Sequence, residues 1–378
     1  MPPPHPSPVF ETFLLPLLNE AAQDWLARFG LNDTHTPSIF QAVDGSVQIS
    51  FNHRLRSYPI LGLLRLWRLR MAALDTWRDE LHFYREAVAV TPSDPASLVT
   101  LSSRRLLDRL KPLMKAAVSY WLYITLILQP VIERVEGRFI NHYNRSIRHA
   151  GDPDPQVFLR GQETRSLDAE RSVYTLSESP RELPAVAELL LDPYGTMLTW
   201  ESFSAACQAT GEGRQFLQML QAHLEQFGHQ ISSFDPHLPT CSDDPLPVLK
   251  AVRDYLQGVE SPYDRQTRQL QERTSAVTAI EARLSPRQLA TFHALLSAAQ
   301  YAERECQDAT FELGLAWVPL RRSLLELGRR LASAGAIASP NDVFGLTRTE
   351  LFTAAAKLDA ISSQHSAVNG QQKNKVES

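Results

Sequence analysis

The sequence predicts a predominantly α-helical protein with long, bent helices and one short β-hairpin. Apolar residues recur three or four positions apart in most segments, which is the spacing of one face of an α-helix. Proline follows a serine or an aspartate where several of these segments begin, an order that is typical of helix N-termini. Only residues 39–51 indicate strands, because two short apolar runs flank Asp44-Gly45, a dipeptide that favours a tight hairpin turn.

The composition is that of a folded protein of ordinary charge. The chain has 378 residues, of which 43% are hydrophobic and 21% are charged, and its formal net charge is -4. This charge gives no reason to expect nucleic acid as a partner. The cysteines Cys207, Cys241 and Cys306 are far apart, which favours free thiols in a reducing compartment over a disulfide framework. The N-terminus lacks the basic start and apolar run of a signal peptide, so we expect a cytoplasmic protein.

One uncharged segment, residues 116–132, has two interpretations. It is slightly short for a membrane span, it contains Gln129 and Pro130, and it lies within a longer helical pattern. We therefore interpret it as a buried core helix and expect no membrane partner, with a membrane helix as the alternative.

We expect four parts along the chain: a disordered N-terminus (1–8), a helical part with the hairpin (9–150), a second helical part (151–358) and a disordered tail (359–378). In the first helical part, the pattern predicts helices over 9–29 and 59–90, and from Pro95 to about residue 149. Prolines 16, 112 and 130 are expected to bend or interrupt them.

In the second helical part, the pattern predicts a helix starting near Pro180 and two helices around the loop at 228–244. Gly228 is expected to end the first of these in a left-handed conformation, and Asp244 to cap the second. The longest helical run is predicted over 285–334, and Gly335 is expected to close it. A short extended segment should follow at 339–347, and Thr347 with Glu350 makes a capping box for a last helix.

Three blocks resemble the central region of the phosphoenolpyruvate-utilising dikinase family, which includes phosphoenolpyruvate synthases and rifampin phosphotransferases. Residues 158–184 are similar to the family's Leu-Gly-Glu-Thr segment and the helix after it. Residues 214–255 resemble its Gly-His loop and the acidic-Pro helix start. Residues 315–351 resemble its long helix followed by Asp-Val-Phe and a Thr-capped helix. The blocks cover about half of the chain in the family's order.

The resemblance implies a region that lies between an ATP-binding domain and a swivelling phosphohistidine domain. The sequence contains no Gly-Gly pair and no Gly-rich loop that would cradle phosphates. None of its eleven histidines lies in the family's Gly-rich Ser-His-x-Ala context. We therefore expect that this chain binds no cofactor, and that ATP and Mg are bound by partner domains. Gln230 and Ser233 stand where many members have Arg and Glu, which points to a different substrate.

Ten residues are candidates for substrate binding, and none is a candidate for catalysis. They are Arg160, Glu163, Thr164, Arg165, His229, Gln230, Asp235, Trp317, Arg321 and Arg322.

Each group of candidates also has a structural interpretation. Residues 160–165 form a polar motif that suits an anionic group, or equally a solvated loop with a helix cap. His229 follows a helix end, so it either contacts an acceptor hydroxyl or fixes the loop through backbone carbonyls. Arg321 and Arg322 face a partner's phosphates or form the solvated side of a helix. Trp317 is a core residue or lines an apolar ligand pocket. A metal site formed by His223, His229, His237 and Cys241 has no zinc-finger spacing, so we expect no metal.

The leading hypothesis is a standalone component of a dikinase-type phosphotransferase that binds a small apolar hydroxylated acceptor or docks partner chains. The partners would supply ATP binding and the phosphohistidine, so the chain is not expected to be catalytic alone. The first alternative is a non-catalytic helical scaffold or small-molecule-binding protein derived from that family. An enzyme that is active alone on a small apolar substrate ranks last, because the sequence shows no nucleophile–base pair.

Overall fold

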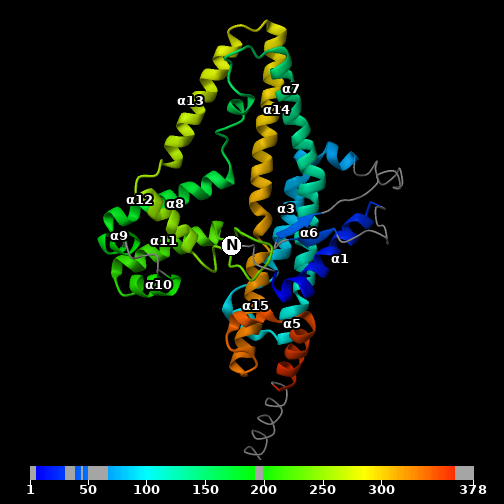
Figure 1. The fold of residues 1–378 in the computed structure, drawn as a ribbon, viewed down its shortest axis with the longest axis vertical. Helices are drawn as coiled ribbons and strands as arrows, with labels where there is room; N and C mark the ends of the chain where they lie inside the picture. Colours follow the sequence, from blue (N-terminus) through cyan, green and yellow to red (C-terminus); the bar gives the residue numbers. More distant parts are fainter. Residues whose placement is uncertain (1–5, 30–38, 44–45, 50–66, 192–198, 362–378) are drawn as a thin grey trace, which may run out of the picture.

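The computed structural model describes residues 6–29, 39–43, 46–49, 67–191 and 199–361 of the chain. Within these residues most elements are helices, and the two short strands pair only with each other, so the predicted fold class is confirmed. The long helix α14 (Pro286–Phe311) is the central column of the molecule (Figure 1). A lobe of short helices lies on one side of this column and the N-terminal helices lie on the other (Figure 1).

The predicted hairpin forms from β1 (Phe40–Val43) and β2 (Ser46–Ile49), which pair antiparallel with Phe40 opposite Ile49. Asn19 of the first α-helix anchors it: its side chain donates to the Phe40 carbonyl and accepts from the Phe40 amide, both at 3.0 Å. The expected turn residues, Asp44 and Gly45, lie outside the described residues.

The N-terminal elements are η1 (Phe10–Leu14), α1 (Leu15–Ala27), α3 (Ala73–Ala89), α4 (Pro95–Thr100), α5 (Ser103–Asp108), α6 (Leu110–Tyr123), η3 (Ile124–Leu128) and α7 (Gln129–Ser146). Both η1 and η3 are π-helical turns, and each directly precedes the turn that holds Pro16 or Pro130. Proline lacks an N–H and its ring clashes with the carbonyl four residues before it, so a wider turn accommodates it. The predicted interruptions at these two prolines are therefore observed.

The apolar segment around residues 116–132 lies within a helical stretch, Ser103–Ser146, that is long and apolar enough to cross a membrane. In the structure 56% of its apolar window is buried. Side chains such as Trp121 and Leu128 belong to the largest hydrophobic core, together with those of α1, α3 and the C-terminal helices. This burial agrees with the interpretation as a core helix.

The lobe consists of α8 (Arg165–Glu182), α9 (Pro184–Leu191), α10 (Trp200–Gln208), α11 (Gly211–Phe227) and α12 (Leu246–Leu256). These helices enclose a second hydrophobic core, in which Phe203 and Phe216 pack edge to face at 6.0 Å. The loop of residues 228–245 connects α11 to α12 and runs back toward the central column.

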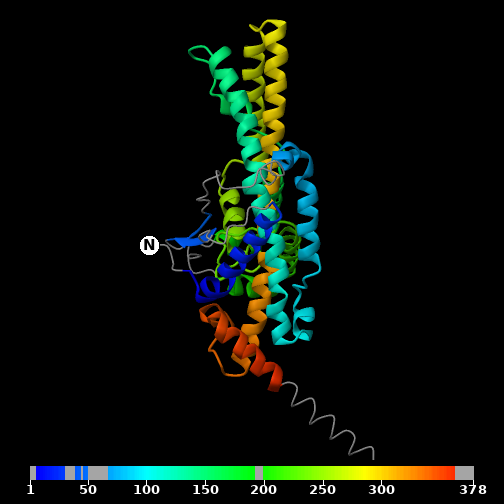
Figure 2. The ribbon, with the colours of Figure 1, turned by 90° about the vertical axis from the view of Figure 1, so that its right-hand side faces the viewer.

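A third core lies in the long arm at the top of Figure 1. The arm consists of the end of α7, η4 (Pro155–Phe158), α13 (Pro262–Glu281) and the first half of α14 (Figures 1 and 2). Phe139 and Tyr143 of α7 pack there against Phe158 and Phe292. This core joins side chains from both sides of residue 150, and the expected division of the chain there stays a prediction.

The C-terminal elements return to the largest core. After α14 the chain forms η6 (Glu312–Gly314), α15 (Trp317–Ser333), η7 (Pro340–Gly345) and a helix over residues 348–361. Gly335 closes α15 with a φ of 70°, as expected. Thr347 and Glu350 form the expected capping box, in which the Thr347 amide donates to the Glu350 carboxylate at 2.8 Å.

Three local predictions are wrong. α8 continues through Pro180, and the next helix begins at Pro184. Residues Pro340–Gly345 form a 3₁₀ helix and not an extended segment. Gly228 has a right-handed φ of -74°, and its small size is what matters. A Cβ on Gly228 would lie 2.2 Å from the Ser242 hydroxyl oxygen, so the glycine lets the loop pass close to the end of α11.

Candidate functional site

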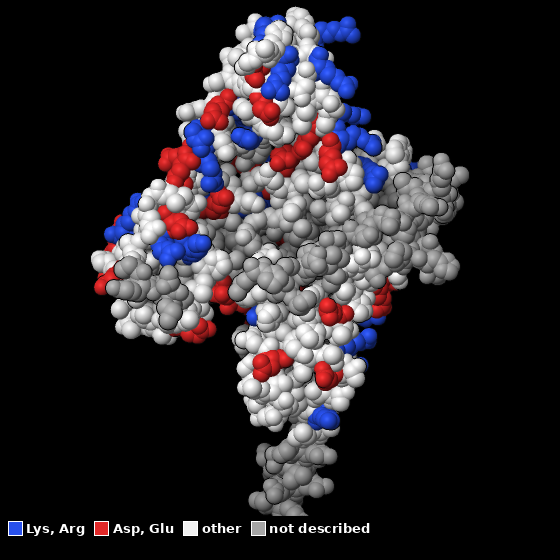
Figure 3. Space-filling model, in the orientation of Figure 1, with Lys and Arg blue, Asp and Glu red and all other residues white. Residues whose placement is uncertain are grey.

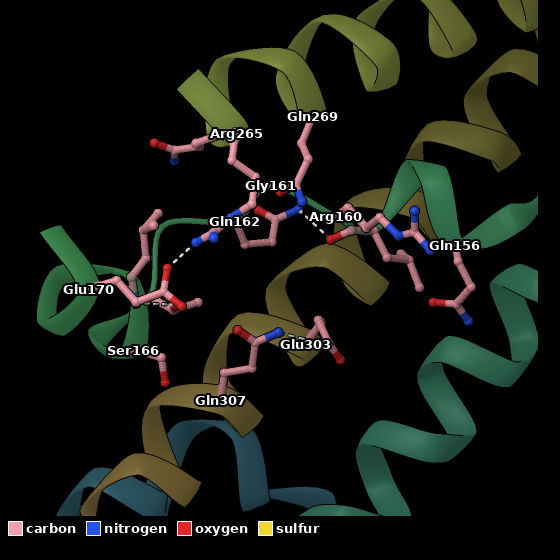
Figure 4. Close-up of a pocket in the computed structure, with 14 residues that line it drawn as sticks. Gln156, Arg160, Gly161, Gln162, Ser166, Glu170, Arg265, Gln269, Glu303 and Gln307 are labelled. Carbon is pink, nitrogen blue, oxygen red and sulfur yellow. Dashed lines mark hydrogen bonds and ion pairs between the residues drawn. The ribbon is translucent and has the colours of Figure 1, made fainter. Parts of the chain in front are cut away.

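Two cavities meet on the surface of α14. The polar groove, of about 280 Å³, lies between residues 156–170 on one side and α13 and α14 on the other (Figure 4). The apolar cleft, of about 690 Å³, lies between residues 230–234 and the segment from the last turns of α14 through η6. Ser166, Glu303 and Gln307 line both cavities, so the two are adjacent, and we call them together the hollow on α14.

The start of α8 is fixed against α14. Thr164 is the N-cap, and its hydroxyl accepts a hydrogen bond from the Leu167 amide at 3.3 Å. The Arg165 amide donates to the Asp308 carboxylate of α14 at 2.8 Å. Because both ends of this contact are helical, Ser166 is held at the junction of the two cavities.

Polar contacts join the segment before α8 to α13. Gly161 has a φ of 73°, which favours glycine, and a Cβ there would lie 3.3 Å from the Cβ of Gln269. The Glu163 carboxylate pairs with Arg171 at 2.7 Å and accepts from the Gln266 amide at 2.7 Å. These contacts hold the wall of the polar groove in place.

The loop after α11 is tied to the end of α14. The His229 ring nitrogen Nε2 lies 3.2 Å from the Phe311 carbonyl oxygen, and the two rings pack edge to face at 5.1 Å. A Cβ on Gly314 would lie 2.2 Å from the His229 carbonyl oxygen, so only glycine permits this close approach. Burial lowers the pKa of His229, which favours a neutral ring at neutral pH.

The same loop is also tied to α15. The Trp317 indole donates to the Phe234 carbonyl at 3.0 Å, and the Arg321 guanidinium donates to the His237 carbonyl at 2.9 Å. Arg321 also pairs with Asp243 at 3.3 Å. The wall of the apolar cleft at residues 230–234 is therefore held from both ends.

A third cavity, of about 410 Å³, lies on the other side of the loop. His229, Arg85, Arg165 and Arg322 are among the residues that line it, together with Glu312. The Glu312 carboxylate is buried and pairs with Arg85 at 2.7 Å and with Arg165 at 3.2 Å. Because Arg85 and Arg165 are already paired with Glu312, this cavity is a weaker candidate for anion binding than the number of its arginines suggests.

The structure separates the ten predicted site residues. Those that line the polar groove or the apolar cleft are Arg160, Thr164 and Gln230. Those that line the third cavity are Arg165, His229 and Arg322. Those that line none of these cavities and make structural contacts are Glu163, Asp235, Trp317 and Arg321.

Asp235 accepts hydrogen bonds from the amide and the hydroxyl of Ser7, at 2.6 and 2.7 Å, and so fixes the start of the described chain. The role of the ten residues in binding stays a prediction.

Sequence reasoning missed the face of α14 that joins the two cavities. Glu303, Cys306, Gln307 and Thr310 line the hollow and recur at helical spacing. Their pattern looks like the solvated side of an amphipathic helix, and only the approach of α8 and of residues 230–234 makes it the floor of a cavity. The sequence does contain this polar stripe on one face of the α14 segment, but the stripe alone does not show that other elements approach it.

On the face shown in Figure 3, basic and acidic side chains are interspersed. In the described parts of the chain, from residue 6 to 361 with their gaps, no group of three or more His, Cys, Asp or Glu is placed to hold a metal ion.

A comparison with protein families identifies the segment that contains most of this hollow. Residues 138–305 match the family model for the rifampicin phosphotransferase fourth domain. Over these residues the chain is similar to the fourth domain of rifampicin phosphotransferases. This confirms the resemblance to phosphoenolpyruvate-utilising dikinases over two of the three blocks. The third block, at 315–351, lies beyond the matched residues, and its assignment stays a prediction.

One curated relative is the chondramide synthase cmdD of Chondromyces crocatus, which is 28% identical over 242 residues. The match covers 61% of this chain but only 6% of that protein.

The fourth-domain match covers α8 to α13 and most of α14, and it includes the whole lobe and all of the polar groove except Gln307. Residues 306–314 complete the apolar cleft just beyond it.

Proposed function

We propose that this chain binds a small apolar hydroxylated molecule in the hollow on α14, as the acceptor-binding component of a dikinase-type phosphotransferase. The observation that carries this proposal is the union of an apolar cleft and a polar groove within and beside the fourth-domain segment. Ligand sites commonly combine a mainly apolar wall with a few polar groups that orient the ligand.

The apolar cleft suits the body of such a molecule. Ile231, Phe234, Phe311 and Leu313 contribute apolar surface. Its volume of about 690 Å³ lies within the range of about 300–1,000 Å³ that is usual for ligand pockets.

The polar groove suits the hydroxylated end. Its wall carries amide side chains such as Gln156, Gln162 and Gln269, which both donate and accept hydrogen bonds (Figure 4). The charged side chains there are of both signs: Glu170 pairs with Arg265, and Arg160 and Glu303 also line the groove. No excess of positive charge therefore favours a phosphate over a neutral polyol or amide.

The phosphoryl donor must come from elsewhere in the assembly, since the sequence has neither a phosphate cradle nor a phosphohistidine motif. We propose that ATP, Mg and the phosphohistidine belong to partner proteins or to further domains. The fourth-domain match supports this arrangement, because the name of the matched family describes the transfer of a phosphate group to rifampicin.

Blocking the apolar cleft should abolish ligand binding. Thr310 is exposed on α14 and lines the cleft, so Thr310→Trp fills the cleft without replacing a core residue. With a panel that contains rifampicin and 2-naphthalenemethanol, we expect this variant to weaken binding at least about tenfold, or about 1.4 kcal/mol. Isothermal titration calorimetry of the purified chain measures the affinity.

Ser297→Trp is the matched control, because Ser297 is exposed on the same helix and lies outside these cavities. It should bind the panel as the wild type does. Equal binding by Thr310→Trp and the wild type would exclude the cleft as the site. If no compound binds the wild-type chain, the acceptor-binding proposal is wrong and the scaffold alternative takes its place.

A further inference from the structure

One residue of the hollow, Glu303, is held by hydrogen-bonding groups on two sides. Its carboxylate oxygen Oε1 accepts a hydrogen bond from the Gln307 amide at 2.7 Å, along α14. On its other side lies the Glu136 carboxyl of α7, within hydrogen-bonding reach. Glu303 also lines both the polar groove and the apolar cleft (Figure 4).

Two carboxyl groups can form a hydrogen bond only if one of them carries a proton. Glu136 meets this condition: burial, followed by the hydrogen bond to Glu303, raises its pKa to about 8. In addition, Oε1 of Glu136 is buried and receives no hydrogen bond from a donor. The raised pKa favours the protonated form of Glu136 at neutral pH, in which its carboxyl can donate a hydrogen bond to Glu303.

The other groups around this pair do not neutralise it. On α7, Glu133 is exposed and adds negative charge. On α14, Cys306 faces the same carboxylates, which contribute to its raised pKa after burial. Across the groove, Arg265 is already paired with Glu170, and Arg160 is exposed.

We propose that Glu303 accepts a hydrogen bond from the ligand hydroxyl, and that Glu136 acts as a positioning residue that holds the Glu303 carboxylate at the junction of the two cavities. This inference deepens the proposed function and rests on it. The hydroxyl would bind where the apolar body leaves the cleft, which makes Glu303 the residue that selects alcohols over ethers. A hydrogen bond to a charged acceptor is strong enough to give such selectivity.

The test compares 2-naphthalenemethanol with its methyl ether, which lacks the donor hydroxyl. For the wild type at pH 6.5 we expect the alcohol to bind about ten times more tightly than the ether, by fluorescence titration. Glu303→Ala should bind both compounds with the affinity of the ether. Selectivity that survives in Glu303→Ala would overturn the proposal.

The role of Glu136 has a readout of its own in the pH profile. Above about pH 8 Glu136 loses its proton and can no longer donate to Glu303, so its charge should repel the Glu303 carboxylate and reduce the selectivity of the wild type. Glu136→Gln can donate an amide hydrogen to Glu303, so it should keep the selectivity at pH 6.5 and at pH 8.5. Glu136→Leu should lose the selectivity at both values.

Glu133→Gln removes a nearby charge from the same helix outside both cavities. Because the Glu133 charge contributes to the raised pKa of Glu136, this variant should keep the selectivity at pH 6.5 and lose it at a lower pH than the wild type. A wild-type selectivity that is the same at both pH values would overturn the positioning role of Glu136. If neither compound binds the wild type, the hollow itself is not the site, and the proposed function fails together with this inference. Binding of both compounds without selectivity would overturn this inference alone.

Discussion

Replacing Arg321 by alanine should lower the free energy of unfolding by about 3 kcal/mol, the lower end of the range for breaking a buried ion pair. The Arg321 side chain is 8% exposed and pairs with Asp243, whose side chain is 11% exposed. It also donates to the carbonyls of Pro236 and His237. The loss should be in the lower part of the range because Thr240 still donates to Asp243 at 2.9 Å. Denaturant titration followed by circular dichroism measures it.

Arg322→Ala is the matched control for this prediction. Arg322 pairs with the same carboxylate at 3.4 Å, but its side chain is 33% exposed. Solvent-exposed pairs contribute about 1 kcal/mol or less, so this variant should be close to the wild type. Equal losses in the two variants would show that the burial of Arg321 does not decide the effect.

Trp317→Ala should be at least as destabilising, by about 3–5 kcal/mol. The indole is 1% exposed, and its ring packs against Trp121 and Phe234 at 4.8 and 5.8 Å. Its N–H holds the Phe234 carbonyl, so the substitution also leaves a buried acceptor without its donor. Because Phe234 forms a wall of the apolar cleft, binding of 2-naphthalenemethanol should weaken too.

Trp317→Phe separates packing from the hydrogen bond. It keeps most of the apolar contact and removes only the donor, so we expect a loss of about 1–3 kcal/mol. If Trp317→Ala is as stable as Trp317→Phe, the ring does not contribute to the core as the structure indicates. Denaturant titration measures both variants.

The sequence predicted the helical elements well where local chemistry determines them. Asp94 caps α4 by accepting from the Ser97 amide at 2.8 Å. The start of α14 at Ser285-Pro286 was predicted from the same pattern, a capping residue followed by proline. The prediction from sequence was wrong where contacts between residues far apart in the chain determine the local conformation. Gly228 is needed for its size, because Ser242 passes close to it, and not for a left-handed turn.

The candidate site was less predictable than the fold, for the same reason. Gln230 and Arg160 were identified and line the hollow, but Glu303 and Gln307 were not. They join the site because Asp308 fixes α8, and Gly314 admits the loop, on that side of α14. Neither contact leaves a periodic pattern in the sequence. Arg321, which resembled a binding residue, is used to anchor the loop.

Protection of Cys306 from alkylation tests the central claim most directly. Cys306 lines the apolar cleft, whereas Cys241 is also partly buried but lies outside the cavities described above. Burial raises the pKa of both thiols, so the reaction with iodoacetamide should be followed at about pH 9 by peptide mass spectrometry. With 2-naphthalenemethanol at ten times its dissociation constant, alkylation of Cys306 should slow about tenfold while that of Cys241 stays unchanged. Unchanged alkylation of Cys306 under saturating compound would contradict binding in the hollow on α14.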